Sequence, residues 1–177
     1  MSMLFPLLSR PAQSYHTGGR RFGANRSNGR KHAGCDLIAP IGTPVRAVED
    51  GEVILFRYFY HDTYYIAVDH GQFVVRYGEI AQKLPAGVRV GTRVLRGQHI
   101  GYIGRLSGGS HMLHFEMYDG SSSGELTDRG NQPYQRRQDL IDPTPYLDAA
   151  RFDSGEGQAI LPRFMTPWSV ARTCFPP

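Results

Sequence analysis

Three side chains in this sequence form a set that suits a metal ion, and they occur in two short segments. His32 and Asp36 lie within residues 32–36, and His114 lies within residues 110–116. Two imidazoles and one carboxylate leave one coordination position of a zinc ion open for water, as in hydrolytic sites. The set therefore predicts a zinc hydrolase. The alternative is a group of ordinary hydrogen-bonded side chains, since the chain has 7 histidines.

The spacing of His32 and Asp36 requires a bend between them. In a straight strand these residues share a face but lie about 13 Å apart. Two ligands of one zinc ion each lie about 2 Å from the metal. A helix would bring positions i and i+4 together, but Gly34 and the pair Ala39-Pro40 disfavour a helix. We therefore expect a bend at Gly34, where the missing side chain permits unusual dihedrals.

The second segment alternates as a strand does. Its two expected faces are Met112, His114, Glu116 and Tyr118 on one side, and Leu113, Phe115 and Met117 on the other. His114 is therefore expected to face a site while the back of its strand packs on the core. His111 lies an odd number of residues from His114, so it points elsewhere unless the strand begins after it or contains a bulge.

The composition is that of one globular domain with many turns. The chain has 177 residues, of which 40% are hydrophobic and 20% charged, with 21 glycines and 12 prolines. The formal charge of +4 and the pI of about 9.2 suit an anionic partner such as a cell wall. Nucleic acid is not an expected partner, because the sequence has no zinc-finger pairing, basic helix or lysine-rich tail.

Two further features concern the cell compartment. Cys35 and Cys174 are too few for a disulfide framework, and Cys35 is expected to be a small core residue. No segment approaches the about 20 apolar residues of a transmembrane helix. The first ten residues have no basic residue before their apolar run, so they do not resemble a secretory signal. We expect a protein made in the cytoplasm that stays there or is delivered by a specialised route.

The order of local patterns favours an all-β core. Strands are expected at residues 45–48, 52–56, 64–68, 73–77, 88–94 and 98–104, with a hairpin turn at 69–72. No helical period separates these strands, which indicates antiparallel pairing. A short helix is expected over 142–151, with Asp142 as N-cap and Pro143 at the first position. The expected organisation is an irregular segment 1–19, one domain over 20–150, and a tail 151–177 that packs back through Trp168.

Several segments together resemble the lysostaphin/LytM-type zinc peptidases of bacterial cell walls. The similar segments are Phe22–Arg26, His32–Val45 with Ala47–Val53, Val88–Gly104, Leu113–Glu116 and Asp142–Leu147. The resemblance implies a mainly β, single-domain fold with an antiparallel sheet core, a groove that holds the zinc site, one short C-terminal helix and long loops.

The resemblance also implies a cofactor and a substrate. One Zn²⁺ per chain would be bound by His32, Asp36 and His114, with a water in the fourth position. Zinc lowers the pKa of such a water towards about 7 and polarises a substrate carbonyl. The implied reaction is the hydrolysis of an amide bond in the peptide cross-links of peptidoglycan, with peptidoglycan stem peptides as the partner.

Two positions depart from the family pattern. The family usually has helper histidines where this chain has Met112 and Glu79. In one interpretation Glu79 acts as general base and His111 stabilises the oxyanion. In the others, the domain binds zinc and wall peptides but catalyses poorly, or it is a scaffold that regulates another hydrolase. Retention of all three ligands favours activity, although Glu79 and His111 also fit ordinary solvated side chains.

Six residues are predicted to contact substrate from the groove: Arg26, Tyr77, Met112, Tyr134, Arg136 and Arg137. The two neighbouring arginines suit a peptide carboxylate, which they would bind through bidentate hydrogen bonds. The alternative for Arg136 and Arg137 is a solvated basic loop. Tyr118 and His16 are further candidates for the groove.

The resemblance and the missing export signal together favour an antibacterial wall hydrolase, delivered by a type VI-like secretion system or released by phage. An effector of this kind enters the periplasm of a rival cell and requires a cognate immunity protein. Two alternatives stay open, a non-catalytic wall-binding module and a cytoplasmic zinc hydrolase that acts on another amide.

Overall fold

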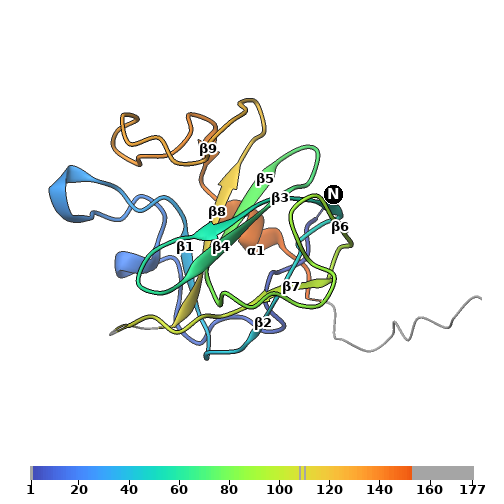
Figure 1. Ribbon diagram of the computed structural model, residues 1–177. Helices are drawn as coiled ribbons and strands as arrows, with labels where there is room; N and C mark the ends of the chain where they lie inside the picture. The colour runs from blue at the N-terminus through green and yellow to red at the C-terminus, as the bar shows by residue number, and fades with distance from the viewer. Residues whose placement is uncertain (1, 108, 110, 153–177) are drawn as a thin grey trace, which may run out of the picture.

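The main element of the protein is an antiparallel β-sheet, seen in the computed structural model of Figure 1, which describes residues 2–107, 109 and 111–152. In spatial order its strands are β1 (Cys35–Ile38), β8 (Met112–Tyr118), β5 (Val74–Ile80), β4 (Tyr64–Asp69), β3 (Gly51–Tyr58) and β6 (Arg93–Val94), with β9 (Leu140–Ile141) paired to β8. Every pairing is antiparallel. The predicted mainly β fold with an antiparallel core is therefore confirmed.

The remaining elements are short. β2 (Pro44–Arg46) and β7 (His99–Tyr102) form a separate two-stranded sheet. The α-helix α1 (Thr144–Ala149) and the 3-10 turns η1 (Gly18–Arg20) and η2 (Ser27–Gly29) complete the set within the described residues. In that same part of the chain, no helix has the length and apolar character needed to span a membrane.

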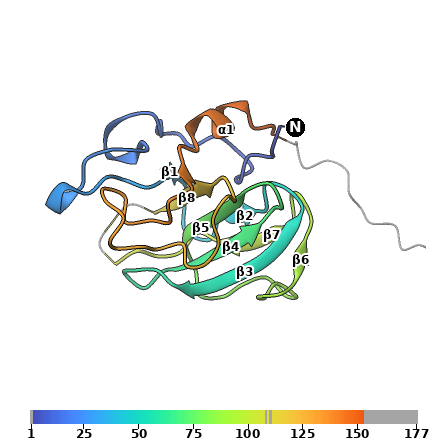
Figure 2. The same cartoon turned by 90° about the horizontal axis from the view of Figure 1, so that it is seen from above.

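One face of the main sheet packs on the hydrophobic core. The small sheet, the first residues of the chain and α1 cover this face, and Figure 2 shows α1 and the chain start on the same side. The core side chains from the sheet alternate along each strand, among them Cys35, Leu37, Val75, Tyr77, Leu113, Phe115 and Met117. The segment predicted to be irregular also contributes to the core, since Met3, Phe5 and Leu7 are buried in it. This packing fixes which residues of each strand face the other way.

The opposite face carries polar and charged side chains. His114, Glu116 and Arg76 occupy it, together with Asp36 from β1. The long loop between β8 and β9, residues 119–139, lies beside this face, and its Leu126 joins a second apolar cluster with Tyr65, Ala67, Val74 and Tyr118. The alternation predicted for residues 112–118 therefore places His114 away from the core.

Local predictions were confirmed where two strands pair directly and were less accurate elsewhere. The predicted hairpin is β4–β5, although β5 continues to Ile80. Residues 45–48 do not form a strand of the main sheet, because β2 ends at Arg46 and pairs with β7. The helix begins later than predicted, at Thr144, whose N–H donates to Asp142 Oδ1 at 2.8 Å. Cys35 is a buried core residue as expected, whereas Trp168 and Cys174 lie outside the described residues.

Candidate metal centre

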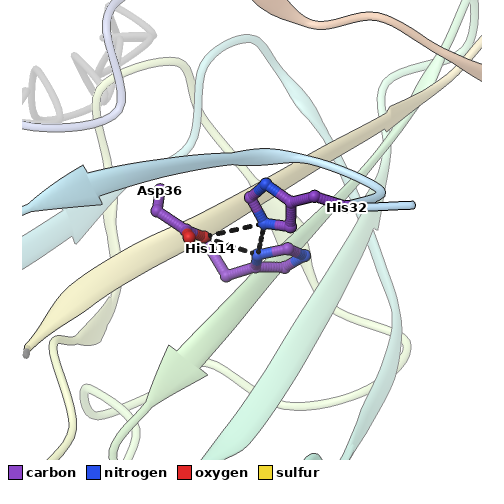
Figure 3. A group of neighbouring side chains, drawn as sticks. All are labelled: His32, Asp36 and His114. Carbon is purple, nitrogen blue, oxygen red and sulfur yellow. Dashed lines mark hydrogen bonds and ion pairs between the residues drawn. The ribbon is translucent and has the colours of Figure 1, made fainter. Parts of the chain in front are cut away.

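Three metal-binding side chains meet on the polar face of the main sheet, as Figure 3 shows. Asp36 Oδ1 lies 2.8 Å from His114 Nδ1 and 3.0 Å from His32 Nε2. The two ring nitrogens are 3.1 Å apart. All three residues are buried, with exposed fractions of 8%, 6% and 4% for Asp36, His114 and His32. The structure therefore brings together the three residues that the sequence singled out.

Strand register and one bend assemble this group. Asp36 pairs directly with His114 across β1 and β8, so the two side chains share a face at short range. The chain bends at Gly34, as predicted, which directs His32 back toward Asp36. A Cβ atom at position 34 would overlap the carbonyl group of Phe115, whose carbon would lie 2.9 Å away. Only glycine therefore fits at this bend.

Hydrogen bonds on the far side of each ring select the tautomer that a metal needs. His32 Nδ1 lies 2.9 Å from the carbonyl oxygen of Arg21, so it donates and leaves Nε2 for the group. His114 Nε2 lies 2.9 Å from Glu116 Oε1, which leaves Nδ1 for the group. Metal-binding histidines commonly donate their second ring N–H in this way. The outer contacts thus leave one nitrogen of each ring, His32 Nε2 and His114 Nδ1, facing Asp36 and available to a metal ion.

The distances and the donor types fit a zinc ion. Ligands about 2 Å from a tetrahedral metal lie about 3.3 Å from one another, close to the separations within this group. Two neutral imidazole nitrogens and one carboxylate oxygen are also zinc ligands of ordinary type. His32, Asp36 and His114 are therefore the residues that would bind the ion, and a fourth position would stay open.

In the absence of an ion, protons compensate the charge of the group. Burial alone would lower the pKa of His114, but its hydrogen bonds to Asp36 and Glu116 outweigh burial and raise that pKa to about 9. Burial opposes ionisation of Asp36, yet hydrogen bonds from both histidines hold its pKa well below the usual range. Burial lowers the pKa of His32. A metal ion at this place would replace the proton shared by Asp36 and His114.

A network of buried charged groups contacts the Nε2 side of the His114 ring. Glu116 is fully buried, and its Oε2 lies 3.0 Å from Arg76 Nη1 and accepts a 2.6 Å hydrogen bond from the Tyr118 hydroxyl. Its Oε1 accepts hydrogen bonds from Arg136 Nε and Nη2, at 2.8 and 2.7 Å. Burial opposes ionisation, but the two arginines outweigh it and hold the pKa of Glu116 well below its usual range. Glu116 therefore stays ionised and keeps its contact with His114.

Glu79 reaches the polar face through a β-bulge. The register of β4 and β5 shifts between Tyr64 and Ile66, so that Gly78 and Glu79 together oppose Tyr65. Glu79 has a φ of 61°, in the left-handed region. A regular strand would place Glu79 on the core side after Tyr77, whereas here the next core residue is Ile80. The extra residue thus moves the carboxylate to the side of His114.

The Glu79 carboxylate is buried and only half paired. The Tyr60 hydroxyl donates to its Oε1, and its Oε2 has no hydrogen-bond partner among the described residues. Burial raises the pKa of Glu79 to about 6, against the opposing effects of His114, Tyr60 and Arg26. A carboxylate with a pKa near neutrality suits proton transfer.

Four of the predicted substrate contacts have informative positions. Arg26 Nη2 lies 3.5 Å from Asp36 Oδ2, beside the ligand group. Met112 begins β8 on the same face as His114 and is partly exposed. Tyr134 stacks on Phe22 with ring centroids 4.9 Å apart. Arg136 contributes its guanidinium to Glu116, as described above, so its main contact is with the protein itself.

Other predicted positions require correction. Tyr77 does not face a groove, because its side chain is fully buried in the core and its hydroxyl accepts from the Val48 N–H. Arg137 is 8% exposed and forms a two-bonded ion pair with Asp139 at 2.6 and 2.8 Å. It also lines a polar hollow of about 700 Å³ within residues 122–138, away from the ligand group.

His111, Tyr118 and His16 also lie elsewhere. His111 precedes β8 and lines a hollow of about 540 Å³ with residues 7–12 and 38–43, none of which is a ligand. The position of His111 in this structure therefore does not match the predicted role in stabilising the oxyanion. Tyr118 is fully buried against Glu116, and His16 Nε2 lies 3.0 Å from the carboxylate of Asp148.

Comparison with known proteins agrees with this geometry. The family model described as Peptidase family M23 matches residues 30–127, which include all three ligand-type residues and Glu79. The match covers more than half of the chain. The fold is of the lysostaphin/LytM type, and the protein belongs to Peptidase family M23.

Individual peptidases are also similar to this chain in sequence or in fold. The peptidoglycan DD-endopeptidase ShyA of Vibrio cholerae is 37% identical over 89 residues, which are 49% of this chain and 20% of ShyA. Lysostaphin from Staphylococcus simulans superposes with a TM-score of 0.63 at 24% identity, over 97% of this chain and 63% of that protein. A zinc-containing peptidase from Vibrio cholerae gives a TM-score of 0.55 at 26% identity, over 83% of this chain and 40% of that one. The matched region is only a fifth of ShyA, so the likeness covers part of that protein and about half of this chain.

Sequence reasoning missed two residues of the site. Glu116 was assigned to the correct face, but its contact with His114 depends on χ angles and on arginines 40 and 20 residues away in sequence. Tyr60 was not singled out, since it lies in a turn and meets Glu79 only through the tertiary fold. The one available signal was the i, i+2 spacing of His114 and Glu116 on one strand face.

Proposed function

We propose that this protein is a zinc-dependent endopeptidase that hydrolyses amide bonds in the peptide cross-links of bacterial peptidoglycan. The observation that carries the proposal is the buried group of His32, Asp36 and His114, with ligand atoms 2.8–3.1 Å apart. This group lies within the region that matches Peptidase family M23. The relative ShyA, a peptidoglycan DD-endopeptidase, supports the substrate class.

The metal ion and the side chains would supply different parts of the hydrolysis reaction. When bound, zinc supplies a Lewis acid that polarises the substrate carbonyl and makes a water more acidic. Glu79 is the proposed general base, because its Oε2 is buried, unpartnered in the described structure and carried on the same face as His114. Oε2 accepts a proton from the attacking water and returns it to the amine that leaves.

The residues around the ligand group provide the proposed substrate contacts. Arg26 lies beside Asp36 with its side chain one-third exposed, so it is placed to meet a carboxylate of a stem peptide. Met112 replaces a helper histidine on the His114 face and provides an apolar contact there. Tyr134, stacked on Phe22, extends this surface.

One observation favours a second candidate function. The two positions at which the family usually has helper histidines hold Glu79 and Met112 in this chain. A domain that binds zinc and wall peptides without cutting them, or that regulates another hydrolase, would tolerate both changes. This candidate predicts binding to sacculi without release of fragments.

Digestion of purified sacculi separates the two candidates. Zinc-loaded wild type should release new muropeptides, whereas His114→Ala should release none and contain no stoichiometric zinc. His99→Ala is the matched control, since His99 is exposed on β7, and it should behave as wild type. Glu79→Gln should keep zinc but lose most activity. An inactive wild type with one bound zinc would favour the binding module.

We further propose that the protein is delivered to the wall of a target cell and that a cognate immunity protein protects the producing cell. An antibacterial effector should kill when it is directed to the periplasm, and Asp36→Asn should abolish killing. A co-expressed immunity protein should restore growth. Absence of toxicity from a catalytically active protein would remove the effector role and leave the peptidase function intact.

A further inference from the structure

Tyr60 makes a contact with the proposed base that the sequence did not reveal. It lies in the turn between β3 and β4, and its hydroxyl donates a hydrogen bond to Oε1 of Glu79. Glu79 lies on β5, 19 positions further along the chain. Their contact is therefore a product of the tertiary fold and not of local chain geometry.

The turn that carries Tyr60 has an unusual and well-anchored backbone. His61 and Asp62 have φ angles of 47° and 63°, both in the left-handed region. The Tyr60 carbonyl oxygen accepts from the Thr63 N–H at 3.0 Å and from its hydroxyl at 2.7 Å. Two consecutive left-handed residues define a hairpin turn that usually requires Asn and Gly, so this pair is held at a conformational cost.

Glu79 also lies on left-handed backbone. Its own φ of 61° belongs to the bulge that moves its side chain off the core face. Both partners of the hydrogen bond thus depend on left-handed backbone at non-glycine residues. Such conformations persist only where surrounding structure enforces them, and they cluster at functional sites.

The same turn lies over the face that holds His114. Phe59, next to Tyr60, has its ring centroid 5.6 Å from that of His114. Its Cε1 would lie 3.0 Å from a Cβ at position 78, so the hairpin packs closely against β5 at Gly78. Tyr60 itself remains 38% exposed. The pair Tyr60–Glu79 therefore lies at the boundary between the buried ligand group and solvent.

We propose that Tyr60 is a positioning residue for the reaction: it occupies Oε1 of Glu79 and so leaves Oε2 as the single oxygen that exchanges protons with substrate. This inference rests on the proposed peptidase function. The hairpin between β3 and β4 thereby orients the proposed base in a chain that has Glu79 and Met112 in place of the helper histidines. A lone carboxylate without Tyr60 would rotate and present either oxygen.

Kinetics of the zinc-loaded full chain on cross-linked muropeptides test the role. Tyr60→Phe should lower kcat about tenfold while KM and zinc content stay unchanged. The acid limb of the pH profile should move to higher pH, since the lost hydrogen bond favours the ionised carboxylate. Tyr58→Phe is the control, because Tyr58 lies on the same hairpin and is 58% exposed. Equal kcat values and pH profiles for Tyr60→Phe and wild type would overturn the proposal.

A measurement without substrate distinguishes this inference from the proposed function. Proton NMR of the zinc-loaded protein should show a slowly exchanging phenolic proton that Tyr60→Phe removes, Tyr58→Phe retains and Glu79→Gln shifts. If wild type cuts no muropeptide, the peptidase proposal fails, and this signal still decides whether Tyr60 holds Glu79. Absence of the signal from wild type would overturn the positioning role.

Discussion

His114 Nε2 lies 2.9 Å from Oε1 of Glu116, its neighbour two positions along β8. The contact joins the ligand group to a carboxylate that two arginines neutralise, Arg76 at 3.0 Å and Arg136 at 2.7 Å. Because Glu116 accepts from Nε2, Nδ1 is the His114 nitrogen that faces Asp36 and would bind a metal ion. The orientation of a metal ligand is thus set by residues that do not touch the metal.

Substitution of Glu116 should therefore weaken zinc binding. Glu116→Gln removes the charge that selects the His114 tautomer, and we expect a loss of about 10- to 100-fold in zinc affinity. Competition with a chelator of known affinity measures it. Glu125→Gln is the control, because Glu125 is exposed and pairs with Arg57 on the surface. Equal affinities for both variants would contradict the supporting role.

Gly34 should tolerate no side chain. A Cβ there would meet the carbonyl group of Phe115, a backbone atom set that cannot move without breaking the β1–β8 pairing. Gly34→Ala should therefore cost about 3 kcal/mol in the free energy of unfolding and reduce zinc binding. Gly109→Ala is the control, since its nearest neighbour would lie 3.6 Å away. Denaturant melts of both variants measure the difference, and a similar small effect in both would count against the close approach.

Glu79 should limit the stability of the metal-free protein above neutral pH. Its pKa is raised to about 6 from 4.5, so ionisation is harder in the folded state, and stability falls as pH rises through this window. At pH 8 the penalty is about 2 kcal/mol. Glu79→Gln should remove it, which makes the variant more stable than wild type at pH 8 but not at pH 4. Urea melts at both pH values check this, and equal differences at both would refute it.

His70 should make the protein sensitive to mild acid. Burial lowers its pKa, and both ring nitrogens have partners, the Asp50 carbonyl oxygen at 3.0 Å and the Tyr77 hydroxyl at 3.1 Å. The unfolded chain therefore binds a proton more readily, and stability declines as pH falls below about 6.5. His70→Gln should show a shallower decline between pH 7 and pH 5 in thermal melts of the zinc-loaded protein. A slope identical to that of wild type would exclude His70 as the cause.

The strand faces over residues 112–118 and the bend at Gly34 could be predicted from the sequence because both depend on short-range patterns. The structure confirms both, with Leu113, Phe115 and Met117 in the core and a bend at residue 34. The grouping of the three ligand-type residues was implied by the family resemblance, and the pairing of β1 with β8 produces it.

The prediction that Tyr77 faces the groove was wrong, because its orientation depends on a feature that no local pattern marks. Its strand was predicted to end there, and nothing local marks the bulge at Gly78 that separates the core residue Tyr77 from Glu79 on the other face.

Side chains that join distant segments were beyond reach of the sequence. Arg136 and Arg137 are neighbours in one loop, yet the first turns to Glu116 and the second to Asp139. Their partners depend on how the loop of residues 119–139 crosses the polar face. His111 likewise points into a hollow lined by residues 7–12, a contact that requires the N-terminal segment to pack beside β1.

Hydrolysis of sacculi in water enriched in oxygen-18 tests the central claim most directly. The zinc-loaded protein should release muropeptides in which each newly formed carboxyl group carries one oxygen-18 atom, with its position in the cross-link peptide found by mass spectrometry. Asp36→Asn should release none, whereas Asp69→Asn, at an exposed position on β4, should match wild type. Sacculi left intact by a wild-type protein that contains one zinc per chain would contradict the claim.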